Sequence, residues 1–135
     1  MYIEPNELTT HLGAEQIEAI SDGDETMLQA AIDAAFVEAK SYLKAFDVAG
    51  EFVKTGTARN ALLIIFIKDI AVWHFINTCS VNTVYSDRKD RYERAISWLR
   101  GVQKGEVSPD IEALPADEQA AIITYNSNTK RNNHY

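Results

Sequence analysis

The stretch Ala61–Ile76 reads ALLIIFIKDIAVWHFI, and it lies inside a longer run from Thr57 to Cys79. Apolar residues fall on nearly every side of a helical wheel drawn for this stretch, which is typical of a helix surrounded by protein. Lys68 and Asp69 stand at its middle, where each would cost about 2.5–3.5 kcal/mol on membrane-insertion scales. The stretch therefore predicts a buried central helix of a soluble domain rather than a membrane span.

A second long helix is predicted before the central one, between Glu25 and Phe46, with Asp24 as its N-cap. Its apolar residues recur at alternating spacings of four and three, which places them on one face. They are Leu28, Ile32, Ala35, Ala39, Tyr42 and Phe46. This stripe is expected to pack on the central helix, where replacing Ile65 or Phe66 by Ala should cost on the order of 2–5 kcal/mol.

Two shorter helices are predicted at the start of the chain. Pro5 suits the first turn of a helix, Gly13 interrupts it, and residues 14–20 form a second short turn. Residues 47–56, which contain Gly50 and Gly56, read as a connector between the two long helices.

A last long helix is predicted after the polar loop Ser80–Ser86, with Asp87 as its cap and Gly105 as its stop. Its apolar face consists of Tyr92, Ala95, Ile96 and Leu99. Its basic residues alternate with acidic ones, which favours a solvated face with weak ion pairs; a contact with a partner is the alternative.

Beyond Val107 the periodicity is lost, so the sequence predicts a helical domain over 1–107 and a C-terminal arm over 108–135. The expected fold is all-α, a compact bundle of about four helices with that arm extended from it. Small, β-branched and aromatic residues followed by bases make the arm a candidate contact with a neighbouring subunit or partner. Its candidate interface residues are Ile122, Ile123, Tyr125, Lys130, Arg131 and Tyr135. A tail without function is the alternative.

The net charge of −7 is unevenly distributed. Residues 1–51 hold eleven Asp and Glu against two Lys, a balance of −9, whereas residues 52–135 hold nine acids against eleven bases, a balance of +2. An acidic chain is a poor candidate for a dedicated duplex-DNA binder. The asymmetry is consistent with solubility alone or with a subunit whose two ends meet partners of opposite sign.

The sequence contains no pattern that supports catalysis or cofactor binding. A Gly-rich phosphate loop, histidines at metal-ligand spacing, Cys-x-x-Cys and a nucleophile elbow are all missing, and Cys79 is the only cysteine. His11 is expected on a short surface helix, His74 as a hydrogen-bonded side chain of the central helix, and His134 in the arm. We therefore expect neither an enzyme nor a bound metal or cofactor.

Four segments together resemble the small helical head–tail connector proteins of tailed bacteriophages, the group that includes the Mu-type head-completion proteins. The segments are Tyr2-Ile3 with Glu7-Leu8 and Leu12-Gly13; Ile32 to Ala35 with Ser41-Tyr42-Leu43; Leu62-Leu63 with Asp69-Ile70-Ala71; and Arg91 to Ile96 with Trp98-Leu99 and Gly105 to Val107. The resemblance covers about residues 1–107.

The resemblance implies a structural virion protein whose copies form a ring between the portal and the tail. Its implied partners are other copies of itself and the portal and tail proteins, with DNA only as passing cargo, no membrane and no small-molecule substrate. It would be made in the bacterial cytoplasm and end at the head–tail junction of the virion. The alternatives are a monomeric helical adaptor that binds a cytosolic bacterial protein and an enzyme with an unfamiliar site.

Overall fold

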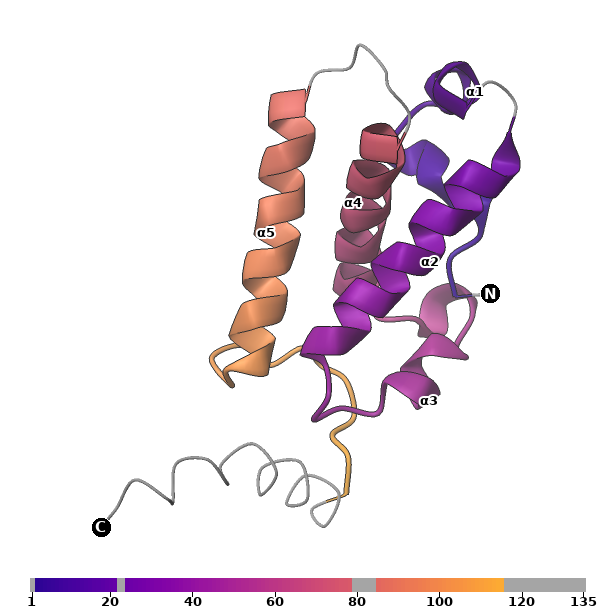
Figure 1. Cartoon of the computed structure of the whole chain (residues 1–135). Helices are drawn as coiled ribbons and strands as arrows, with labels where there is room; N and C mark the ends of the chain where they lie inside the picture. Colours follow the sequence, from indigo (N-terminus) through magenta and orange to yellow (C-terminus); the bar gives the residue numbers. More distant parts are fainter. Residues whose placement is uncertain (1, 22–23, 79–84, 116–135) are drawn as a thin grey trace.

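The helix α4 (Ala61–Thr78) lies at the centre of the molecule, between α2 (Glu25–Tyr42) and α5 (Tyr85–Gln103) (Figure 1). The computed structural model describes residues 2–21, 24–78 and 85–115. Within these residues the chain is helical, has no strand and forms one isolated antiparallel bridge, between Phe46 and Ala113. The predicted all-α class is confirmed.

Shorter elements cover the two ends of this three-helix layer. The 3₁₀-helix η1 (Pro5–Thr10) and α1 (Ala14–Ser21) lie near the start of α2, whereas α3 (Val48–Phe52) lies beyond its end, followed by the 3₁₀-turn η2 (Gly56–Ala58) (Figure 1). The predicted helix starts at Pro5 and Ala14 are confirmed.

The core of the molecule is built around α4. Ten of its residues are buried: Leu63, Phe66, Ile67, Lys68, Asp69, Ile70, Ala71, Val72, Phe75 and Ile76. By length and composition α4 could cross a membrane, but 56% of it is buried inside the protein. The predicted central helix is therefore confirmed as the core of a bundle, with two charged residues in its interior.

The first half of α4 is not enclosed on every side, which corrects the expectation from the sequence. Leu62 and Ile65 are 45% and 46% exposed, because α2 and α5 cover other faces of the helix. A half-exposed side chain leaves no closed cavity when it is truncated, so the burial on which the cost of Ile65→Ala was predicted is wrong, whereas Phe66 is buried as expected.

The helix α2 begins as predicted and ends earlier than predicted. Asp24 caps it, since its side chain accepts a hydrogen bond of 2.9 Å from the Thr26 N–H. The helix stops at Tyr42 because Leu43 leaves the helical conformation and buries its side chain completely. Phe46 therefore lies outside the helix, while the rest of the stripe packs on α4: Leu28, Ile32, Ala35 and Ala39 are buried and Tyr42 is half-buried.

The connector after α2 contains a helix that the sequence did not predict. Asp47 accepts a hydrogen bond of 2.9 Å from the Gly50 N–H and caps α3. An Asp three residues before Gly is a short capping signal, easily lost beside two glycines that indicate a loop.

The predicted apolar face of α5 is confirmed, with Ala95, Ile96 and Leu99 buried and Tyr92 half-buried. The helix begins at Tyr85, so Asp87 lies in its first turn instead of capping it; residues 79–84 of the preceding loop lie outside the described residues. Gly105 ends the helical segment as predicted, with a φ of 81° that glycine adopts without strain.

Residues 108–115, which the sequence assigned to the arm, lie against the body of the molecule. Ile111 is 9% exposed and belongs to the hydrophobic core. The Leu114 N–H donates to the Ala45 carbonyl and the Asp47 N–H to the Glu112 carbonyl, at 3.0 and 2.8 Å. Ordered packing therefore continues past residue 107; the division into domains at that residue stays a prediction.

Candidate functional site

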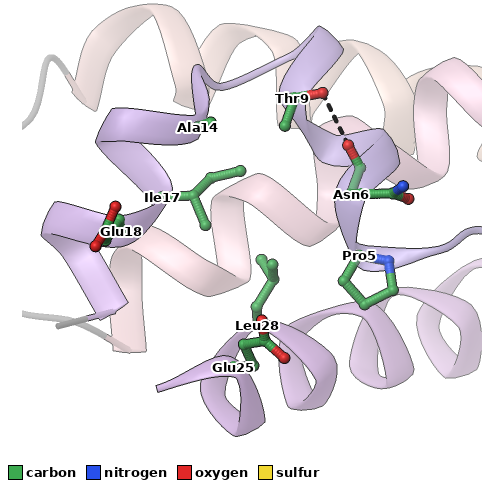
Figure 2. Close-up of a pocket in the computed structure, with 8 residues that line it drawn as sticks. All are labelled: Pro5, Asn6, Thr9, Ala14, Ile17, Glu18, Glu25 and Leu28. Atoms are coloured by element: carbon green, nitrogen blue, oxygen red, sulfur yellow. Dashed lines mark hydrogen bonds between the residues drawn. The ribbon is translucent and has the colours of Figure 1, made fainter. Parts of the chain in front are cut away.

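A groove of about 380 Å³ opens between η1, α1 and the start of α2 (Figure 2). Ile17 and Leu28 point toward one another across its middle, while Glu18 lies on α1 on the side away from η1 and Glu25 lies beside Leu28. Its lining consists of Pro5, Asn6, Thr9, Ala14, Ile17, Glu18, Glu25 and Leu28. The groove thus offers an apolar floor with carboxylates at its margin, which suits an apolar segment that carries a positive charge.

The wall formed by η1 is held by a specific ion pair. Arg59 Nη2 lies 2.8 Å from Glu7 Oε1 and Arg59 Nη1 lies 3.1 Å from Glu7 Oε2, a two-point contact. The hydrogen bond from Arg59 lowers the pKa of Glu7. Arg59 also donates to the Tyr2 carbonyl at 2.6 Å, so it joins the N-terminal segment to the turn before α4.

The charge around the groove has one sign. The first 39 residues of the chain contain nine Asp and Glu and no Lys or Arg. Glu15, Glu18 and Glu25 are exposed, and none of the groove-lining side chains is basic. Part of the acidic half predicted from the sequence, with Glu18 and Glu25 in the lining itself, therefore lies at this end of the bundle.

A second exposed apolar surface, the α4 stripe, consists of Leu62 and Ile65. Trp98 of α5 lies beside it, packed on Phe66 with ring centroids 5.0 Å apart, and shares a hollow with Leu62. Arg88, Arg91 and Arg94 of α5 lower the pKa of Asp69, which stands one turn after Ile65 on α4. The hollow beside Leu62 is also lined by Glu51, Lys54, Arg59 and Asp110, so the charge near the stripe has both signs, whereas the charged side chains that line the groove are acidic.

A buried polar cluster lies next to the stripe. Asp69 Oδ1 is 3.4 Å from His11 Nε2, and Thr10 Oγ1 accepts a hydrogen bond of 3.2 Å from Lys68 Nζ. Burial, with Lys68 and Arg91 nearby, lowers the pKa of His11 to about 4, so its ring is neutral at pH 7 and the contact with Asp69 is no ion pair there. Asp69 Oδ1 has no aligned hydrogen bond within the described residues, and burial raises its pKa.

This cluster corrects the position predicted for His11. His11 is the residue that follows the last turn of η1, and its imidazole turns inward, so that only 11% of the side chain is exposed. It is carried inward because Leu8 and Leu12, on either side of it in the sequence, are buried. The short apolar pattern around His11 is the signal that could have indicated its burial.

His74 makes the hydrogen bond that the sequence predicted. Its Nε2 lies 3.2 Å from Glu38 Oε1, and the Tyr92 hydroxyl donates to both oxygens of Glu38 at 3.1 and 3.0 Å. Burial and the Glu38 carboxylate raise the pKa of Tyr92 to about 12. One residue from each of α2, α4 and α5 is thereby joined in a structural contact.

A second buried carboxylate, Glu51, holds the opposite end of the bundle together. Its Oε1 accepts hydrogen bonds from the Tyr2 hydroxyl at 2.7 Å and the Asn60 N–H at 2.6 Å, and its Oε2 accepts one from Lys54 at 2.8 Å. Burial alone would raise the pKa of Glu51, but the donors Lys54, Tyr2 and Asn60 together lower it. The side chain of Asn60 also donates to the Pro109 carbonyl at 2.8 Å. Sequence reasoning did not find this network.

The interface residues predicted in the arm lie outside the described residues, so Ile122, Ile123, Tyr125, Lys130, Arg131 and Tyr135 stay a prediction, as does the arm position of His134. In the part of the chain that the structure describes, His, Cys, Asp and Glu form no group of three that could hold a metal ion.

Residues 2–124 match the protein family described as “Bacteriophage Mu, Gp36”. The chain belongs to this family. It is a Mu-type phage protein, as its resemblance to the Mu-type group indicated. The match extends beyond Val107 and includes the docked residues 108–115 as well as the candidate residues Ile122 and Ile123. Comparisons with curated proteins and with solved structures gave no match.

Proposed function

We propose that this phage protein is a head–tail connector subunit whose copies form a ring between the portal and the tail. Membership of the Mu Gp36 family carries the proposal, because it makes the chain a phage protein over nearly its whole length. The two different exposed apolar surfaces, the groove with its acidic margin and the α4 stripe, support it, since a subunit that repeats in one direction needs two different complementary faces.

The proposal includes the partners that a connector requires. They are other copies of the chain, the portal and the tail proteins, with DNA as cargo that passes without sequence recognition, and neither a membrane nor a small-molecule substrate is involved. The net charge of −7 supports a subunit that does not retain DNA by itself. Its role is structural and not enzymatic, first in the bacterial cytoplasm and then at the head–tail junction of the virion.

The arm carries the contact between neighbours in this proposal. Ile122, Ile123 and Tyr125 supply apolar area, and Lys130 and Arg131 supply charge opposite to the acidic end of the next subunit, with Tyr135 as a further aromatic contact. The alternative of a monomeric helical adaptor for a cytosolic bacterial protein would not require such an arm.

Removal of the gene from the phage tests the function. We expect DNA-filled heads and free tails that do not join, visible by electron microscopy, and restoration by the intact gene supplied in trans. A second strain that lacks only residues 116–135 should make the protein in normal amounts and still fail to join heads to tails. Infectious particles assembled at the normal yield without the protein would contradict the connector role.

A further inference from the structure

We propose that the arm segment Ala120–Arg131 of one copy docks in the groove between η1, α1 and α2 of the neighbouring copy. This inference rests on the proposed ring and assigns the arm its binding site. The segment AAIITY at 120–125 is apolar, and Lys130 and Arg131 follow it by five and six residues. A docking surface for it needs an apolar depression and an acidic margin near one end.

The groove has both properties, whereas the α4 stripe has one. The groove floor is formed by Ile17 and Leu28, and its margin carries Glu18 on α1 and Glu25 beside Leu28 (Figure 2). The stripe of Leu62 and Ile65 is apolar, but the charges near it have both signs, with arginines of α5 around Asp69 and with Glu51, Lys54, Arg59 and Asp110 in the hollow beside Leu62. Charge complementarity therefore selects the groove.

The shape of the surface selects the mode of docking. An extended segment can add to the edge of a sheet or place side chains in a groove. The described parts of the chain, 2–21, 24–78 and 85–115, contain no strand and so offer no sheet edge. At about 380 Å³ the groove lies near the lower end of the range of small-molecule pockets, about 300–1,000 Å³, so it fits a few side chains such as those of Ile122 and Ile123.

The position of the groove favours a neighbouring copy over the arm's own subunit. The chain leaves the body beside Ala45, past the end of α2, whereas the groove lies at the start of α2 (Figure 1). Between Leu28 and Tyr42 the helix rises about 21 Å. Residues 114–122 span at most about 26–29 Å when fully extended. The arm would reach its own groove only when nearly taut, at a high cost in conformational entropy.

The resulting contact is heterologous, because the arm at one end of a subunit meets the groove at the other end of the next. Repetition of such a contact produces a ring when the rotation closes and a filament when it does not. The groove thus supplies the receiving face that the proposed ring requires.

Disulfide trapping in the full chain tests the docking directly. Every protein in the experiment carries Cys79→Ala. One protein then carries Asn6→Cys at the exposed margin of the groove, and the other carries Ile123→Cys in the arm. The two are mixed at the concentration at which rings form and are oxidised. We expect the mixed disulfide to form roughly tenfold or more faster than with the matched control Ser97→Cys, on the exposed face of α5.

A charge-reversal cycle tests the same contact independently. Glu18→Lys with Glu25→Lys in the groove protein should lower the yield of the mixed disulfide by about three- to tenfold, and Lys130→Glu with Arg131→Glu in the arm protein should restore it. Charge reversal at Asp90 and Glu93, two exposed acids of α5, is the control and should change the yield of the mixed disulfide little.

Three results would overturn the docking site. The first is equal trapping by Asn6→Cys and Ser97→Cys, and the second is a reversal effect that the arm substitutions do not restore. The third comes from a further protein that carries both Asn6→Cys and Ile123→Cys, and it is a disulfide that forms within one chain and not between chains. If rings still join heads to tails while trapping at Asn6 fails, the docking site is wrong and the connector function stands. If heads and tails join without the protein, the connector function itself is wrong.

Discussion

Glu51 and Asp69 are two carboxylates buried to a similar extent, with 2% and 7% of each residue exposed, yet their environments differ. Glu51 accepts three hydrogen bonds of 2.6–2.8 Å, and its pKa is lowered. Asp69 faces a neutral His11 at 3.4 Å, and its pKa is raised. Burial alone therefore does not decide in which direction the pKa of a carboxylate shifts; aligned donors do.

The two sites also differ in the groups that stabilise the ionised form of the carboxylate. The donors to Glu51 are direct neighbours that join the N-terminal segment, α3 and the start of α4. The positive charges that favour the ionised form of Asp69 are those of Arg91, Arg88 and Arg94 on α5, which act on it by charge attraction. The hydrogen bonds to Glu51 stabilise the fold. Asp69, next to the exposed α4 stripe, is a buried carboxylate whose Oδ1 accepts no hydrogen bond from the described residues.

The largest effect is expected from breaking the Glu51 network. Glu51→Ala should lower the free energy of unfolding by about 2–4 kcal/mol, because the Tyr2 hydroxyl and the Asn60 N–H lose their acceptor. Urea unfolding followed by circular dichroism measures it, with the exposed Glu93→Ala as the control. A loss no greater than that of the control would show that water replaces the carboxylate without cost.

The next effect is a dependence of stability on pH that arises from His11. Its pKa falls from 6.5 to about 4 on folding, so below pH 6.5 the unfolded chain binds the proton and the folded chain resists it. Stability contributed by neutral His11 is therefore lost as the pH falls from about 6.5 to about 4, by up to roughly 3 kcal/mol at 1.36 kcal/mol for each pKa unit.

Urea unfolding at several pH values between 4 and 7 measures this dependence. His11→Gln should flatten it. Asp69→Asn should make it steeper, because the raised pKa of Asp69 favours proton uptake by the folded chain and opposes the His11 effect in the same range. An unchanged slope in the His11 variant would place the titrating group elsewhere.

The smallest effect is expected at Asp69 itself at pH 7. Asp69→Asn should change the free energy of unfolding by less than about 1 kcal/mol, since removing a poorly compensated buried charge offsets the lost attraction to the arginines. Thermal unfolding of this variant beside the exposed Asp90→Asn checks it. A loss as large as that of Glu51→Ala would remove the contrast between the two carboxylates.

Local patterns predicted most of the helices correctly. The apolar run predicted α4, and the spacing of Leu28, Ile32 and Ala35 predicted α2. Asp24 predicted the start of α2 and Gly105 the end of the last helical segment, and the structure confirms both. These features depend on neighbours within a turn or two, so the sequence contains the information directly. The end of α2 at Tyr42 and the existence of α3 were missed, because packing of Leu43 and Val48 against the core outweighs the helical pattern that continues to Phe46.

The sequence by itself determined the all-α class, the central helix, the apolar faces of its two long neighbours and the acidic character of the first 39 residues. Only the tertiary structure decided which side of α4 stays open at Leu62 and Ile65, that His11 turns inward, and that Glu18 and Glu25 line one groove. The physical reason is the separation of the partners. Tyr2 and Glu51 are 49 residues apart and Lys68 and Thr10 are 58 apart, so their contacts exist only after the helices have packed.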